Sequence, residues 1–162
     1  NVAVAGDSAG GNLSAAISVH QRDKGAAMPK AQVLIYPWVT ATEEPPSRDD
    51  FAHAYPLNKE LMEFFKGHYL PEGQDDADLR ISPMSSPSQA GLPHALIYTA
   101  GFDPLCDEGE MYADRLKAAG VPVTFRCYES LSHSFTAFSG AIPAARNALN
   151  EIAGELNTVL NG

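Results

Sequence analysis

The chain has 162 residues, of which 44% are hydrophobic and 19% charged, and its 11 Lys and Arg against 20 Asp and Glu give a net charge of −9. This length and composition indicate one globular domain with a substantial core and exclude an intrinsically disordered chain. The acidic balance excludes nucleic acid as an expected partner, and no apolar run is long enough to predict a membrane span.

Four short apolar runs predict β-strands. They cover residues 1–5, 31–36, 95–99 and 121–128. The first three are apolar throughout, which is typical of strands buried on both faces of a parallel sheet. The fourth alternates between apolar and polar residues, as expected of a strand at the edge of a sheet.

Helical periodicity lies between and after these strands. It covers residues 9–20, residues 107–119, which end before Gly120, and residues 142–160. Strands that alternate with helices predict an α/β fold, with a mostly parallel sheet and helices on both of its faces.

Residues 40–93 interrupt this alternation with seven prolines and no clear strand. Asn58 is placed to cap a helix over residues 59–69. The apolar side of that helix would carry Leu61, Phe64, Phe65 and Tyr69. An excursion of this length between two strands usually covers an active site, although a packed surface helix with loops fits the same pattern.

The stretch GDSAGG joins the first strand to the first helix. Its residues are Gly6, Asp7, Ser8, Ala9, Gly10 and Gly11. A G-x-S-x-G sequence between a strand and a helix predicts a nucleophile elbow, a sharp turn that exposes a reactive serine. We expect Gly6 and Gly10 to leave room for the turn and the Ala9 N–H to face a developing oxyanion. The motif alone also fits a glycine-rich helix start with a serine cap.

A serine nucleophile needs a base, and in this fold the chain order is serine, acid, histidine. Asp103 follows the third predicted strand, and His133 lies in the loop after the fourth. Both positions are at the carboxyl ends of strands, where open α/β sheets bind their ligands. We therefore predict that Ser8, Asp103 and His133 form a catalytic triad.

Other acids and histidines are weaker candidates. Asp107, Glu108 and Glu110 fall in the first turns of a predicted helix, where acids commonly interact with the helix dipole. Glu129 ends a predicted strand, and no pattern assigns it a role. His20 lies on a helix far from any strand end. The remaining histidines are in the irregular region and are expected to be surface or hydrogen-bonded residues: His53, His68 and His94.

Five stretches together resemble the hormone-sensitive-lipase-like family of α/β-hydrolase esterases. They are GDSAGGNL, IYPW, RISPMSSP, GLPHALIYTAGFDPLCDEGEMYADRLKAAGVPV and SHSF, and they span nearly the whole chain. The resemblance implies a serine hydrolase that cleaves carboxylic esters of short to medium acyl chains through an acyl-enzyme. It assigns Ser8 as nucleophile, Asp103 as acid and His133 as base.

The chain departs from the family pattern in two places. Ser134 follows His133 where the family usually has glycine, which could change the loop and the placement of the imidazole. The HGGG oxyanion motif, the strands before it and the N-terminal cap have no counterpart in residues 1–162. We therefore expect this chain to be the C-terminal half of the catalytic domain, with residues 40–93 as an excursion within it. Alone it would be a weak or inactive esterase, whereas the full-length protein would be active.

Two alternative functions remain open. A serine peptidase of the prolyl-oligopeptidase kind shares the fold and the triad order, but the GDSAGG and DPLCDEG sequences favour an esterase. A non-catalytic hydrolase-like binding protein would have lost triad members, and all three are present here.

The remaining features concern the cysteines, cofactors, partners and pocket residues. Cys106 and Cys127 are too few for a disulfide scaffold, so we expect two buried or half-buried thiols in a reducing cytoplasm, with a bridge as the alternative. No metal-ligand cluster or phosphate loop is present in the sequence, so no cofactor is implied. We expect a small-molecule ester as the partner and keep a homodimer open. Trp38, Phe135 and Phe138 are candidates for the pocket wall, although aromatic residues near strand ends are more often core.

Overall fold

The computed structural model of the protein describes all 162 residues. Its four strands are β1 (Ala3–Asp7), β2 (Ala31–Ile35), β3 (His94–Phe102) and β4 (Val123–Ser132). They form a single sheet in the order β1-β2-β3-β4, and every neighbouring pair is parallel. The parallel sheet and the edge position of the fourth strand are thus confirmed.

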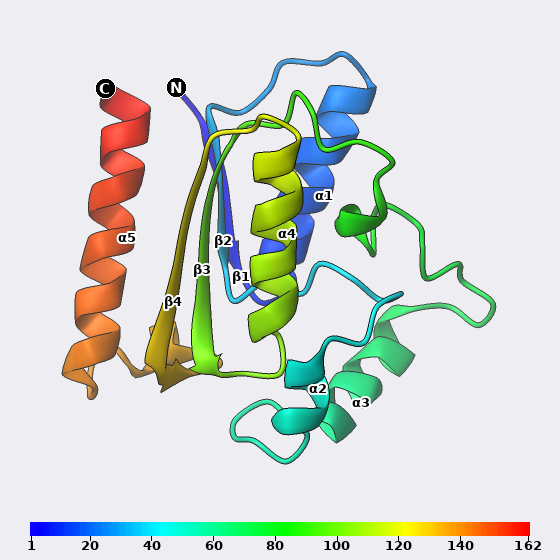
Figure 1. Cartoon of the computed structure of the whole chain (residues 1–162), viewed down its shortest axis with the longest axis vertical. Coiled ribbons are helices and arrows are strands. Elements are labelled where there is room, and N and C mark those ends of the chain that lie inside the picture. The colour runs from blue at the N-terminus through cyan, green and yellow to red at the C-terminus, as the bar shows by residue number, and fades with distance from the viewer.

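Helices cover both faces of the sheet (Figure 1). The helices α1 (Ala9–Asp23) and α4 (Cys106–Ala118) lie on one face, and α5 (Pro143–Asn161) lies on the other. Leu34 and Ile97 belong to the core under α1 and α4, whereas their neighbours Val33 and Leu96 belong to the core under α5. Successive residues of β2 and β3 therefore supply opposite cores, which is why these strands are apolar throughout. No helix is long and apolar enough to cross a bilayer.

The two longest strands differ most from their predicted bounds. The pairing of β3 with β4 continues past the apolar runs to Phe102 and Ser132, with a register shift after Ala100. His94 begins β3 instead of lying in the irregular region, and Glu129 lies inside β4 instead of ending it. Both predictions were wrong because backbone pairing extends beyond the residues that the core requires to be apolar.

The excursion between β2 and β3 contains two helices, α2 (Pro46–Asp50) and α3 (Lys59–Tyr69), and a short 3-10 turn at Pro83–Ser85. Asn58 caps α3 as predicted, since its Oδ1 accepts a hydrogen bond from the Leu61 N–H at 2.9 Å. The predicted apolar side of α3 is not packed, because α3 has no buried residue and Phe64 is 56% exposed. Figure 1 shows α2 and α3 at the carboxyl end of the sheet.

A buried ion pair joins this excursion to α4. Arg48 donates to Glu108 Oε2 from Nη2 at 2.7 Å and from Nε at 3.2 Å, and its Nη2 also donates to the Thr40 carbonyl. Glu108 has no exposed surface and accepts the Val39 N–H at 2.7 Å. Burial raises the pKa of Glu108 to about 7, while Arg48 and the backbone donors act in the opposite direction. The prediction that Glu108 interacts with the helix dipole was therefore incomplete. Glu108 lies four residues before the buried Tyr112, which places it on the inner face of α4.

Replacing Glu108 with glutamine is expected to lower the free energy of unfolding by about 3–5 kcal/mol, because the glutamine NH2 group would face the Arg48 donors and leave them without an acceptor in the interior. Urea unfolding at pH 8, where the Glu108 carboxylate is ionised, measures this loss. The matched control is Glu110→Gln, an exposed acid on the same helix that should change stability little. Equal stability of the two variants would show that the ion pair does not hold the excursion in place.

Candidate active site

Ser8 occupies a strained turn between β1 and α1. Its backbone has φ 52° and ψ −116°, a combination that non-glycine residues rarely adopt. The Ser8 N–H donates to the Ile35 carbonyl at 2.9 Å, which ties the turn to the neighbouring strand. The surrounding sheet and helix hold the strain, and the serine side chain stands half-exposed at the tip.

Two glycines allow this turn to pack. A Cβ on Gly6 would lie 2.3 Å from the carbonyl carbon of Gly10, and a Cβ on Gly11 would lie 2.7 Å from Cβ of Pro37. A Cβ on Gly10 would meet only the Asp7 carboxylate, at 3.9 Å, an ordinary contact. The expectation for Gly6 is confirmed, and the one for Gly10 was wrong. The backbone of Gly10 approaches Gly6, whereas a side chain on Gly10 itself would meet no clash.

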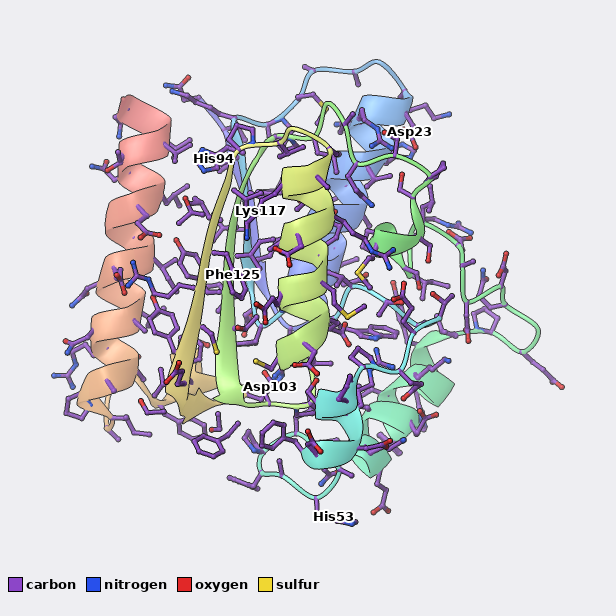
Figure 2. All side chains as sticks on the ribbon, in the orientation of Figure 1. Asp23, His53, His94, Asp103, Lys117 and Phe125 are labelled. Carbon is purple, nitrogen blue, oxygen red and sulfur yellow. The ribbon has the colours of Figure 1, made fainter.

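Ser8, His133 and Asp103 lie in one hydrogen-bonded series. His133 Nε2 is 3.0 Å from Ser8 Oγ, and His133 Nδ1 is 2.7 Å from Asp103 Oδ2. The other oxygen of Asp103 accepts the Leu105 N–H at 2.9 Å, which fixes the carboxylate. Asp103 is fully buried and His133 is 4% exposed. Residues 125 positions apart in the chain thus meet at the carboxyl end of the sheet, where Figure 2 shows Asp103.

Ser134 takes the position where glycine is usual in the resembling family. It adopts the left-handed conformation, with φ 59° and ψ 23°, which glycine enters without a steric penalty. His133 nevertheless contacts both Ser8 and Asp103. The substitution therefore adds backbone strain to the loop while leaving the imidazole within hydrogen-bonding distance of both partners.

Tyr36 contacts this series and was not among the predicted site residues. Its ring centroid lies 4.7 Å from that of His133. Its hydroxyl donates to Asp7 Oδ2 at 3.0 Å and also forms a hydrogen bond with Thr136. Burial raises the pKa of Tyr36, so the hydroxyl stays protonated at neutral pH. One side chain thus connects the serine turn to the segment that follows the histidine.

Replacing Tyr36 with phenylalanine is expected to lower kcat about tenfold with little change in KM, because the ring remains but the turn and the loop lose their link. The lost hydrogen bonds should also lower the free energy of unfolding by about 1–2 kcal/mol. Steady-state ester hydrolysis by the full-length protein and urea unfolding measure the two effects.

The control for this variant is Tyr98→Phe. Tyr98 is also fully buried, and its hydroxyl bonds to Glu155 on α5, on elements outside the serine turn. Both variants should lose similar stability, and only Tyr36→Phe should lose turnover. If both variants turned over substrate equally fast, Tyr36 would have a purely structural role.

A cavity of about 520 Å³ opens beside Ser8. Trp38 lines it, as expected, whereas Phe135 packs in the core against Tyr36 and Tyr128, and Phe138 is not part of the wall. The excursion contributes large apolar side chains to the wall, Leu57, Met62, Phe65 and Tyr69, and also charged ones, Glu44, Arg48, Glu63 and Lys66. The exposed aromatic side of α3 therefore faces this cavity in part.

Asn12 connects the serine helix to the excursion, and the sequence patterns did not single it out. Its Nδ2 donates to the carbonyls of Trp38 at 2.8 Å and Ile81 at 2.6 Å, and its side chain lines the cavity. The one sequence signal for Asn12 is a polar residue that interrupts the apolar pattern of the helix at a buried position.

The other histidines do not join the series. His94 lies at the end of the sheet opposite Asp103, and His53 lies beyond α2 (Figure 2). His68 lines the cavity beside Ser8 and forms a hydrogen bond through Nδ1 with the Phe64 carbonyl at 2.8 Å. No group of three or more His, Cys, Asp or Glu side chains is arranged to hold a metal ion.

The chain is similar to several known proteins. A family model described as alpha/beta hydrolase fold matches residues 1–137. Carboxylic ester hydrolase LipN of Mycobacterium tuberculosis is 46% identical over 139 residues, which cover 83% of this chain and 37% of LipN. Esterase LipI of the same organism is 37% identical over an alignment of 164 residues, covering 99% of this chain and 51% of LipI.

The fold is also similar to that of a solved esterase structure. EstE1, a thermophilic and thermostable carboxylesterase cloned from a metagenomic library, matches with a TM-score of 0.93 and 39% identity. The match covers 99% of this chain and 55% of the EstE1 chain. The 162 residues thus span roughly half the length, or less, of these similar proteins.

Proposed function

Because the chain belongs to the α/β-hydrolase family, in its hormone-sensitive-lipase-like group, we propose that it carries the catalytic triad of a carboxylic-ester hydrolase. The observation that carries this proposal is the series Ser8–His133–Asp103, with bonds of 3.0 and 2.7 Å, beside an apolar cavity. The names of LipN, LipI and EstE1 as ester hydrolases support the reaction class.

The proposed reaction begins when Ser8 Oγ attacks the ester carbonyl carbon and His133 Nε2 takes its proton. Asp103 Oδ2 accepts a hydrogen bond from His133 Nδ1–H, and this bond holds the required tautomer and stabilises the imidazolium. The tetrahedral intermediate collapses as His133 returns the proton to the leaving alcohol, and acyl-Ser8 forms. Water, deprotonated by His133, then releases the carboxylic acid and restores the serine.

The oxyanion needs hydrogen-bond donors, and the Ala9 N–H is the proposed donor within this chain. Ala9 is the first residue of α1, so its N–H has no partner within the helix and lies at the positive end of the helix dipole. We propose that a segment outside these 162 residues supplies further donors, since the chain spans only part of each similar protein. Loss of one such donor typically slows turnover by about 10²–10³-fold.

Hydrolysis of p-nitrophenyl butyrate by the 162-residue chain and by the full-length protein tests this proposal. We expect a slow or inactive chain and an active full-length protein. A chain as fast as the full-length protein would place all the donors within residues 1–162. The peptidase alternative predicts hydrolysis of a dipeptide anilide, which we expect neither protein to cleave.

The cavity suggests the size of the substrate. A volume of about 520 Å³ with mostly apolar walls suits a short to medium acyl chain better than a long one. Across a series of p-nitrophenyl esters, kcat/KM should be highest for butyrate to octanoate and low for palmitate. A maximum at palmitate would contradict this substrate class.

We also propose a homodimer. The support is the outer edge of β4, which pairs with β3 on one side only and leaves backbone groups available to a second copy. Light scattering of the purified protein gives its mass, and a monomer at micromolar concentration would exclude this assembly.

A further inference from the structure

Two cysteines lie in contact outside the proposed triad. Cys106 begins α4, Cys127 lies in the middle of β4, and their sulfur atoms are 3.8 Å apart. Both are free thiols, and both are half-buried. The distance is close to van der Waals contact, whereas a disulfide needs about 2.05 Å, so a modest rotation and shift of the side chains would bring the sulfurs to bonding distance.

The fold keeps the two sulfurs together. Cys127 is aligned with Thr99 across the sheet, and Cys106 Sγ is 3.8 Å from Thr99 Oγ1. A Cβ on Gly109 would lie 2.4 Å from Cγ2 of Thr99, so α4 packs directly on β3 at this level. This packing fixes the start of α4 relative to β4. The two thiols therefore stay close together, and the effective concentration of each at the other is high.

We propose that Cys106 and Cys127 are a modification site, which a low-molecular-weight disulfide such as glutathione disulfide converts into an intramolecular disulfide bond. One protein thiolate attacks glutathione disulfide, forms a mixed disulfide and releases one glutathione. The second protein thiol then displaces the second glutathione and closes the protein disulfide. The protein loses two protons and two electrons, which amount to two hydrogen atoms, and one glutathione disulfide becomes two glutathiones.

Cys127 lines a groove open to solvent. Desolvation and the neighbouring Cys127 raise the pKa of Cys106, so Cys106 is the weaker first nucleophile at neutral pH. The mixed disulfide is therefore expected on Cys127, with Cys106 as the resolving thiol. The bridge closes a loop between positions 21 residues apart and should raise Tm by roughly 5–10 °C.

The test incubates the reduced chain with glutathione disulfide, quenches it in acid, and transfers it to denaturant at neutral pH with N-ethylmaleimide before mass spectrometry. The expected product is lighter than the reduced protein by two hydrogen atoms, carries no maleimide and contains a peptide cross-linked between Cys106 and Cys127. A thermal melt without reductant should show the higher Tm.

Single replacements provide matched controls. Cys106→Ser should stop at the mixed disulfide, with one glutathione on Cys127 and no rise in Tm, and Cys127→Ser should react more slowly. Melts of the reduced variants establish that each one folds. Wild-type protein that keeps two free thiols, carries two glutathiones or links two copies would overturn the proposal.

Discussion

Replacing Ser8 with alanine is expected to lower kcat for p-nitrophenyl butyrate by about 10⁶-fold in the full-length protein. The reason is chemical: alanine has no atom that can form the acyl-enzyme, and His133 then has no proton to accept. The turn itself should remain intact, because the Ser8 N–H that bonds Ile35 belongs to the backbone.

Ser132→Ala is the matched control for this variant. Ser132 is a half-buried serine at the end of β4, beside His133, and its hydroxyl makes only a weak 3.5 Å contact with the His133 carbonyl. Turnover by Ser132→Ala should stay close to that of the unmodified protein, with both variants showing the same thermal unfolding. Substantial turnover by Ser8→Ala would assign the nucleophile to another residue.

Replacing Asp103 with asparagine is expected to lower kcat by about 10⁴-fold. The asparagine oxygen can still accept the Leu105 N–H, but its amide nitrogen would then face His133 Nδ1 as a donor. That contact favours the tautomer with a proton on Nε2, which cannot accept the Ser8 proton. The loss should therefore appear in kcat, with KM little changed.

Asp107→Asn separates this effect from a general loss of negative charge. Asp107 lies four residues further along, and its carboxylate accepts the Ser47 N–H at 2.8 Å instead of contacting His133. Its replacement should leave kcat within a few-fold of the unmodified protein. If Asp107→Asn were the more damaging change, the acid would have been assigned to the wrong residue.

The fold and the Ser8–Asp103–His133 series could be predicted because each of their parts has a signal in a short stretch of sequence. Apolar runs mark strands that are buried on both faces, and a glycine-flanked serine marks the turn after the first strand. Asp103 and His133 could be placed because each follows a strand, and parallel strands end at the same edge of the sheet.

Long-range packing explains what the patterns could not predict. Arg48 and Glu108 are 60 residues apart, and nothing near either residue indicates that they pair in the interior. Tyr36 and Thr136 are 100 residues apart, and their contact depends on how the loop after β4 returns to the turn of β1. The spacing of glycines likewise cannot reveal that Gly11, rather than Gly10, lacks room for a side chain, because that depends on the position of Pro37.

Fluorophosphonate labelling of the 162-residue chain tests whether Ser8 is an activated nucleophile, because it requires an activated serine but no ester turnover. We expect one covalent phosphonate adduct, located on Ser8 by peptide mapping, lost in Ser8→Ala and strongly slowed in His133→Ala. A chain that takes up no label although it is folded, or takes it up on another residue, would contradict the assignment of Ser8 as a nucleophile activated by His133.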